Sequence, residues 1–353
     1  MTAADPEFGL ESERLDGFLA LLAAEGFAGD IARDEATRLV TGTDNSIYQV
    51  MPSAVLFPRT SEDINLVLRL ASSSAFAPIP VTPRGGGTGA NGQALSRGVV
   101  LDLSRRLNRI LDFDPVALSV TVEPGVVLDQ LNAFLAPHGL FFPPSISTAT
   151  RATLGGMVAT DASGKGSRLY GKTSDYIEAM DVVLADGSDF RVEAMGPEAA
   201  ETLRRQPSTA GRAVDQVLST VMAHRAEIER VFPRMNRGLT GYNLQGAWSE
   251  AGGLALQRLL AGSEGTLAVT KAVTLRVMAR PTHRALALVR YDSFEGALAD
   301  VRRLIGAEPL AVEVIDHVIL RAAREDVVWA DLEELLGGPA PRRPASRPGA
   351  GAG

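Results

Sequence analysis

A glycine-rich loop contains the residues best suited to bind a charged ligand. Glycine has no Cβ, so the backbone of such a loop can approach a ligand closely and turn its N–H groups inward as an anion-binding nest. An arginine at the start of the loop adds a positive charge, and the pattern favours a pyrophosphate site over a flexible surface turn. The loop consists of Arg84, Gly85, Gly86, Gly87, Thr88 and Gly89.

A second region, from Pro143 to Gly166, is rich in Gly, Ala, Ser and Thr. Around Gly155-Gly156 and in residues 159–164, small side chains would let a flat ring lie close to the backbone, where N–H and hydroxyl groups can meet its heteroatoms. This composition favours a large planar cofactor. The alternative is tight packing of small side chains in a buried turn.

Two other nucleotide-binding patterns overlap these regions. Gly87-x-Gly89-x-x-Gly92 satisfies the Rossmann fingerprint, but a turn and a strand are predicted after it, where that site needs a helix. Residues 166–173 match the P-loop pattern at every fixed position, with Lys172 as its lysine. The segment before them is polar and glycine-rich, and little room for a helix follows. A P-loop NTPase therefore remains the less favoured alternative.

The elements that must position these loops alternate between strands and helices. Residues 1–49 are predicted to be helical, because apolar residues there recur at helical spacing. An apolar run at 54–58 predicts a strand, and Thr60 and Asp63 form a capping-box pattern for the helix after it. Further strands are expected at 78–82, 99–103 and 119–122, with a helix at 126–135.

The second half of the chain continues this alternation. Asp186-Gly187, between apolar strands at 179–185 and 188–193, predicts a two-residue hairpin turn. Helices are expected at 197–205 and 213–229, followed by a strand at 267–278. Residues 285–291, 293–305 and 310–315 predict a strand, a helix and a strand that begin a further domain. The Gly, Pro, Ala and Arg composition of 338–353 predicts disorder.

Composition excludes several functional classes. The 353 residues are 45% hydrophobic and carry a net charge of −7 with interspersed signs, which argues against a nucleic-acid partner. The chain has no cysteine, which excludes thiolate metal sites and cysteinyl attachment of a cofactor, and its four histidines show no metal-ligand spacing. We expect no metal in this chain. No apolar run approaches the ~20 residues of a transmembrane segment, and a cytoplasmic location is expected.

Four motifs occur in the order found in FAD-linked oxidases of the vanillyl-alcohol oxidase type, which the chain resembles over roughly residues 48–315. They are the glycine loop at 84–89, residues 152–156 with 159–164, Gly-Lys-Thr-Ser-Asp at 171–175, and Gly-Ser-Glu-Gly-Thr-Leu at 262–267. With Thr-Asp-Asn-Ser-Ile-Tyr at 43–48, the chain most resembles the flavin half of the large bacterial D-2-hydroxyglutarate dehydrogenases.

This resemblance implies an α+β, PCMH-type FAD-binding fold of two subdomains. Between the helical segment expected at 1–49 and the tail at 338–353, it implies an FAD-binding domain at 50–280 and the start of a substrate or cap domain at 281–337. The loop at 84–89 would hold the pyrophosphate. The flavin side would be lined by Pro144, Ser145, Gly155, Gly156, Ala159, Thr160, Ser163 and Gly164, and the adenosine side by Glu264, Gly265 and Val269.

The resemblance also implies oxidation of a 2-hydroxy acid, of the D-2-hydroxyglutarate or D-lactate type, to the 2-oxo acid with hydride transfer to FAD. Electrons would then pass to another acceptor or to an iron–sulfur partner. Thr88 stands where histidyl-attached members carry histidine, so FAD is expected to be non-covalent. The cap is expected to be incomplete and no catalytic residue is assigned. A non-catalytic FAD-binding module that needs a partner chain is the alternative.

Overall fold

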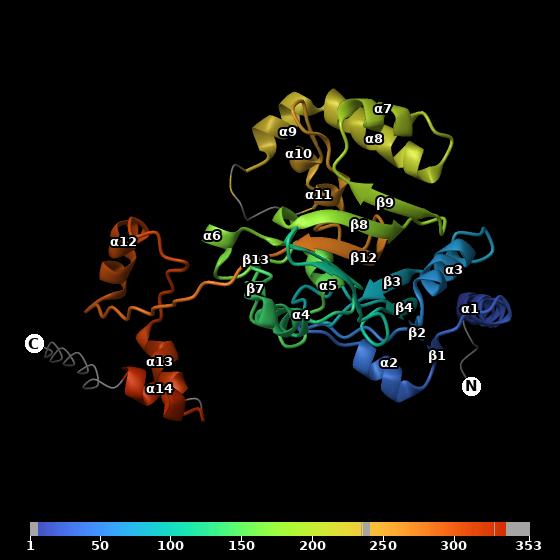
Figure 1. Cartoon of the computed structure of the whole chain (residues 1–353). Helices are drawn as coiled ribbons and strands as arrows, with labels where there is room; N and C mark the ends of the chain where they lie inside the picture. Colours follow the sequence, from blue (N-terminus) through green and yellow to red (C-terminus); the bar gives the residue numbers. More distant parts are fainter. Residues whose placement is uncertain (1–5, 234, 236–240, 328, 337–353) are drawn as a thin grey trace, which may run out of the picture. The chain divides into compact units, whose positions relative to one another are not determined.

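A computed structural model describes residues 6–233, 235, 241–327 and 329–336 (Figure 1). The chain divides into two compact units, residues 1–284 and 285–353, and each is described by itself. In the described residues, every helix lacks the length or the apolar character needed to cross a membrane.

The first unit contains a four-stranded sheet in the order β1-β2-β4-β3. Its strands are β1 (Asp30–Ala32), β2 (Ala54–Phe57), β4 (Val99–Asp102) and β3 (Val81–Arg84). β4 runs parallel to both β2 and β3, and β1 is antiparallel to β2. Helices α1 (Pro6–Ala24) and α3 (Ser61–Ala71) bury Phe18, Leu22 and Ile64 with the strand residues Leu56 and Leu101.

The prediction of a helical N-terminal segment is only partly correct. Helices α1 and α2 (Glu35–Thr41) form, but between them β1 joins the edge of the sheet. Strand β1 has only three residues and no apolar alternation, so the sequence carried little signal for it. The predicted capping box is present at α3, where the Asp63 carboxylate accepts a hydrogen bond from the Thr60 amide at 3.1 Å.

A five-stranded antiparallel sheet forms the second layer, in the order β5-β6-β12-β8-β9. The strands are β5 (Ile110–Asp114), β6 (Ser119–Val122), β12 (Val269–Arg276), β8 (Ile177–Val183) and β9 (Asp189–Glu193). The predicted hairpin forms, but its turn is not the expected two-residue turn. The Leu184 amide bonds the Ser188 carbonyl and the Gly187 amide bonds the Leu184 carbonyl, both at 2.9 Å, so residues 185–187 form a three-residue loop with Gly187 at φ +82°. Helices α4 (Leu128–Leu135) and α5 (Leu154–Ala159) contribute Leu131, Leu135 and Leu154 to the core.

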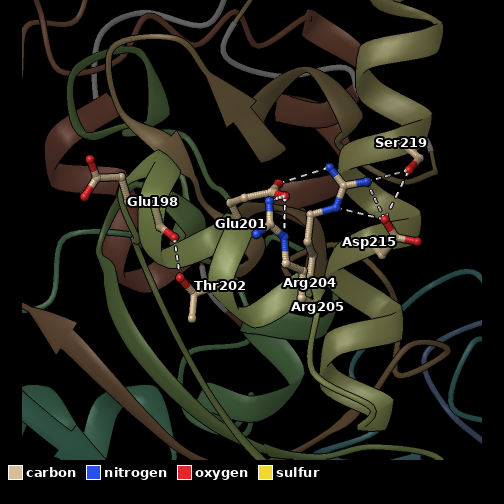
Figure 2. A network of polar contacts seen from close by, with 7 residues as sticks. All are labelled: Glu198, Glu201, Thr202, Arg204, Arg205, Asp215 and Ser219. Atoms are coloured by element: carbon tan, nitrogen blue, oxygen red, sulfur yellow. Dashed lines mark hydrogen bonds and ion pairs between the residues drawn. The ribbon is translucent and has the colours of Figure 1, made fainter.

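A group of helices follows β9 in the chain. It comprises α7 (Pro197–Arg204), α8 (Thr209–Ala223), α9 (Arg225–Val231), α10 (Leu244–Ala247) and α11 (Leu256–Leu260), with the short pair β10 (Trp248–Ser249) and β11 (Gly253–Leu254). The single helix predicted at 213–229 is divided, because His224 at φ −114° and ψ 17° leaves the helical conformation. Charged residues of α7 and α8 form a polar network between the two helices (Figure 2).

Short elements complete the first unit. Helix α6 (Ser167–Tyr170) lies between α5 and β8, and β7 (Leu140–Phe141) pairs with β13 (Met278–Ala279). Two 3₁₀ turns, η1 (Ala136–His138) and η2 (Thr173–Asp175), follow α4 and α6.

In the second unit the structure describes α12 (Phe294–Ile305), α13 (His317–Arg324) and α14 (Trp329–Leu336). The helix predicted at 293–305 is confirmed, and Ser293 caps it by accepting a hydrogen bond from the Gly296 amide at 3.0 Å. The strands predicted at 285–291 and 310–315 are wrong for the described part of the unit. An apolar run becomes a strand only where another strand can pair with it, and neither run is paired there. The predicted tail at 338–353 lies outside the described residues.

Candidate functional site

Two connected hollows form a cleft between the two sheets of the first unit. Residues from β3 lie on one side, and residues such as Met180 from β8 and Val269 from β12 lie on the other. The hollows share Gly85, Gly156 and Glu264 in their walls. The larger one encloses about 560 Å³, within the range of ~300–1,000 Å³ that small-molecule and cofactor sites occupy.

The glycine loop forms one wall of this cleft directly after β3. Gly87 has φ +62°, a conformation that glycine adopts without strain. A Cβ on Gly85 would collide with the Thr153 hydroxyl, and one on Gly86 with the Arg151 carbonyl. In the described part of the chain, no protein acceptor takes a hydrogen bond from the amides of residues 85–89. These amides are therefore available to a ligand.

Arg84 is buried behind this loop. Its guanidinium donates a hydrogen bond to the Thr43 carbonyl at 2.7 Å and to the Ala94 carbonyl at 3.5 Å. Burial lowers the pKa of Arg84, while the charges of Asp102 and Asp44 oppose that shift. Arg84 lines only the smaller hollow, and its contacts hold residues 43 and 94 against the loop. Arg84 thus fixes the conformation of the loop through these hydrogen bonds and also contributes a positive charge.

Helix α5 supports the floor of the cleft. Thr153 is its N-cap, and the hydroxyl accepts a hydrogen bond from the Gly156 amide at 3.3 Å. A Cβ on Gly155 would press on Pro124 at 2.6 Å, so only glycine fits this close contact. Gly155 and Gly156 both line the cleft.

Another wall of the larger hollow is made from two segments that touch. Gly164 packs so closely on the Ser145 carbonyl that a Cβ would overlap it. Ser145, Thr160, Ser163 and Gly164 all line the larger hollow. Sequence reasoning missed further lining residues, namely Gln93, Ser147, Thr148 and Lys165. Lys165 could have been predicted from the sequence, since it is a cation within the small-residue region.

The loop at 262–266 closes the end of the cleft. Glu264 adopts φ +54°, which is uncommon for a residue other than glycine, and its amide bonds the Ala159 carbonyl at 2.8 Å. Gly265 has φ +77°, and a Cβ there would collide with the Pro83 ring. Glu264 lines both hollows, so the loop joins α5 to the β3 side of the site.

The structure brings together all the predicted binding residues except one. Residues of the loop 84–89, the small-residue region and the 264–269 segment line one or both hollows. Pro144 is buried and lines neither hollow. Among the described residues no group of three or more metal-binding side chains is gathered.

The P-loop interpretation of residues 166–173 is wrong. Helix α5 and a polar turn precede them where a P-loop needs a buried strand, and the helix inside the motif, α6, has four residues. Lys172 forms an ion pair with Asp161 and a hydrogen bond with Ser174 at 3.1 Å. Its ammonium group is therefore engaged with the protein rather than free for a phosphate.

Comparison with known proteins is consistent with this site. Residues 52–193 match the family described as FAD binding domain, and residues 280–347 match the family described as FAD linked oxidases, C-terminal domain. A D-2-hydroxyglutarate dehydrogenase of Pantoea ananatis is 46% identical over 92% of this chain and 32% of its own length. That of Escherichia coli is 46% identical over 90% of this chain and 31% of its own. The chain thus spans about a third of these relatives.

More distant relatives and a solved structure also resemble this chain. A probable mitochondrial D-lactate dehydrogenase of Danio rerio is 30% identical over 81% of this chain and 48% of its own length. A solved structure of an alkyldihydroxyacetonephosphate synthase superposes with a TM-score of 0.58 at 18% identity, covering 84% of this chain and 48% of the other. At that identity the structure supports the PCMH-type fold alone.

The residues of the cleft fit FAD in two respects. The glycine loop offers unbonded amides to an anionic diphosphate, and the close-packed glycines at 155, 156 and 164 leave room beside the backbone for a flat ring. Residues 52–193 therefore match an FAD-binding domain of the PCMH type, residues 280–347 match the C-terminal domain of FAD-linked oxidases, and FAD is the cofactor of the chain.

Proposed function

We propose that FAD lies in the cleft between the two sheets, with its diphosphate on the amides of the glycine loop. The observation that carries this proposal is the set of unbonded amides in residues 85–89, beside a cavity of about 560 Å³. Ser145 and the segments 155–156 and 159–164 would then face the flavin, and Glu264, Gly265 and Val269 the adenosine, whereas Pro144 would lie behind the wall. Lys165 adds a positive charge to the same wall.

The chain's own residues bind and orient the cofactor in this proposal. Bound FAD supplies an isoalloxazine ring that accepts hydride. Thr88 has no imidazole nitrogen for a covalent bond to the flavin, and the chain has no cysteine thiol that could form one. Both observations support non-covalent binding. The buried apolar side chains of Met180 and Val182 line the smaller hollow and keep water from its inner end.

We further propose that the chain is the FAD-binding part of a dehydrogenase for a 2-hydroxy acid. Four relatives named D-2-hydroxyglutarate dehydrogenase, at 41–46% identity, support this class, and relatives named D-lactate dehydrogenase support the wider one. We include in this proposal a 2-hydroxy acid as substrate and an electron acceptor or partner that reoxidises the flavin.

A matched pair of glycine variants tests the location of FAD. Gly86→Ala puts a methyl group against the Arg151 carbonyl and should distort the loop, whereas Gly196→Ala places one in open space. We expect the Kd for FAD, measured by quenching of flavin fluorescence, to rise about tenfold or more in Gly86→Ala. It should stay at the wild-type value in Gly196→Ala. Equal affinity in both variants would place FAD elsewhere.

Anaerobic addition of hydroxy acids tests the reaction. The flavin absorbance of the FAD-loaded chain is followed after addition of D-2-hydroxyglutarate, L-2-hydroxyglutarate or D-lactate. Bleaching by D-2-hydroxyglutarate alone would support a site of that specificity within this chain. Stable absorbance with all three acids would mean that the chain binds the cofactor without oxidising these substrates.

A further inference from the structure

The C-terminal turn of α5 has an unexpected residue at its tightest point. Asp161 adopts φ +47°, and the amides of Asp161 and Ala162 bond the carbonyls of Val158 at 3.1 Å and Met157 at 2.8 Å. This is the Schellman arrangement, in which the left-handed position is usually occupied by glycine. An aspartate there costs conformational energy relative to glycine, so its side chain must contribute something that glycine cannot.

The carboxylate of Asp161 connects this turn to the segment after α6. One oxygen accepts a hydrogen bond from the Ser174 amide at 2.8 Å, and the other accepts from the Ser174 hydroxyl at 3.0 Å and from the Lys172 ammonium group. Thr173 adds two hydrogen bonds to the Ala162 carbonyl, at 3.0 Å from its amide and 2.7 Å from its hydroxyl. We call Asp161, Lys172, Thr173 and Ser174 the Asp161 network.

The Asp161 network is shielded from solvent. The side chains of Lys172 and Asp161 are 12% and 14% exposed, and Thr173 and Ser174 are buried. Ion pairs are less weakened by water and salt when they are shielded in this way. The network can therefore hold the turn in one conformation.

The cavity wall lies immediately on both sides of Asp161 in the chain. Thr160 precedes it, and residues 162–165 follow it, all lining the larger hollow. The same turn also receives the loop that carries Glu264, because the Val158 and Ala159 carbonyls accept hydrogen bonds from the amides of Gly262 at 3.0 Å and Glu264 at 2.8 Å. The position of Asp161 is thus coupled to two walls of the cleft.

We propose that Asp161 and Lys172 are positioning residues for FAD, which hold the turn after α5 in its ligand-binding conformation before the cofactor arrives. This inference rests on the proposed location of FAD. A wall that is ordered in advance removes the entropic cost of ordering it on binding. Lys172, the lysine of the P-loop look-alike, thereby acts through the wall of the cleft and not on a phosphate.

The double variant Asp161→Gly/Lys172→Met tests the proposal. It removes one negative and one positive charge, leaves the net charge unchanged, and places at position 161 the residue that prefers the left-handed conformation. Removing both partners leaves neither charge buried alone, and glycine relieves the left-handed strain at position 161, so the apo chain should stay folded. A purely structural role would then leave FAD binding unchanged.

We expect the Kd for FAD of the double variant to rise about tenfold or more, with altered visible circular dichroism of the bound flavin. Lys172→Arg, which keeps the charge, should stay close to the wild type. Asp161→Asn keeps an acceptor for the Ser174 amide and should give an intermediate Kd, which provides a second measurement if the double variant is unstable. Arg204→Met, which breaks an ion-pair network on α7 and α8, is the matched control.

Wild-type affinity and spectrum in folded Asp161→Gly/Lys172→Met or folded Asp161→Asn would overturn the positioning role. The Gly86→Ala variant separates this failure from that of the proposed function. If Gly86→Ala weakens FAD binding while the double variant does not, the location of FAD stands and the positioning role is wrong. If neither variant weakens FAD binding, the proposed location is wrong and the positioning role fails with it.

Discussion

The Asp161 network at the cleft and the Arg204 network between α7 and α8 use the same chemistry in different surroundings. In the Arg204 network, Arg204 contacts Asp215 at 2.5 Å, Glu201 at 3.2 Å and Ser219 at 3.4 Å (Figure 2). Its Asp215 side chain is 51% exposed, whereas the Asp161 side chain is 14% exposed. Arg204 forms ion pairs with both Glu201 and Asp215, whereas Asp161 pairs with Lys172. A count of ion pairs would rank the Arg204 network first, but burial favours the Asp161 network.

The two networks also differ in what their backbones need. Arg204 and Glu201 lie within the regular helix α7, whose backbone hydrogen bonds do not depend on these side chains. Asp161 lies in a left-handed turn, where the side chain offsets an unfavourable backbone conformation. We therefore expect the same type of substitution to have a large effect at the cleft and a small one on the helices.

Lys172→Met should have the largest effect on the stability of the apo chain. It leaves the shielded Asp161 carboxylate without its counterion, and breaking one partner of such a pair is expected to cost about 3 kcal/mol of unfolding free energy. Urea denaturation followed by circular dichroism measures this loss. A cost similar to that of Arg204→Met would remove the contrast between the networks.

Local signals in the sequence predicted the parts of the fold that depend on neighbouring residues. The capping pattern of Thr60 and Asp63 and the hairpin at Asp186-Gly187 both formed, since their interactions span only a few residues. The runs at 285–291 and 310–315 have the composition of strands. They are unpaired in the described residues, because pairing depends on distant chain segments that a local pattern does not specify.

In the candidate site, too, features set by neighbouring residues were predicted and features set by distant segments were not. Glycine spacing predicted the loop at 84–89, because backbone freedom is a property of the residue itself. The burial of Arg84 against Thr43 could not be predicted, since it depends on the meeting of segments 41 residues apart. The pairing of Lys172 with Asp161 was hidden for another reason: residues 166–173 match a phosphate-binding pattern, and only the surrounding elements distinguish the two roles.

Arg204→Met should lower the stability of the chain much less than Lys172→Met. Exposed ion pairs contribute little because water screens them and two long side chains must be ordered. We expect the melting temperature to fall by about 1–2 °C, and the difference from the wild type to shrink further when the salt concentration rises from 0.1 to ~1 M. A fall as large as that of Lys172→Met would show that exposure does not decide the weight of these networks.

Acidification should reveal a still smaller contribution, from Glu201. Its hydrogen bond with Arg205, followed by that with Arg204, lowers the pKa of the Glu201 carboxylate below its ordinary value of 4.5. Because the folded-state pKa is the lower one, the stabilisation is fully present above about pH 4.5 and is lost as the pH falls through the folded-state pKa. The difference in melting temperature between the wild type and Glu201→Gln should therefore be largest near neutral pH and disappear in acid. A difference that stays constant across this range would mean that the charge of Glu201 does not stabilise α7 through Arg204 and Arg205.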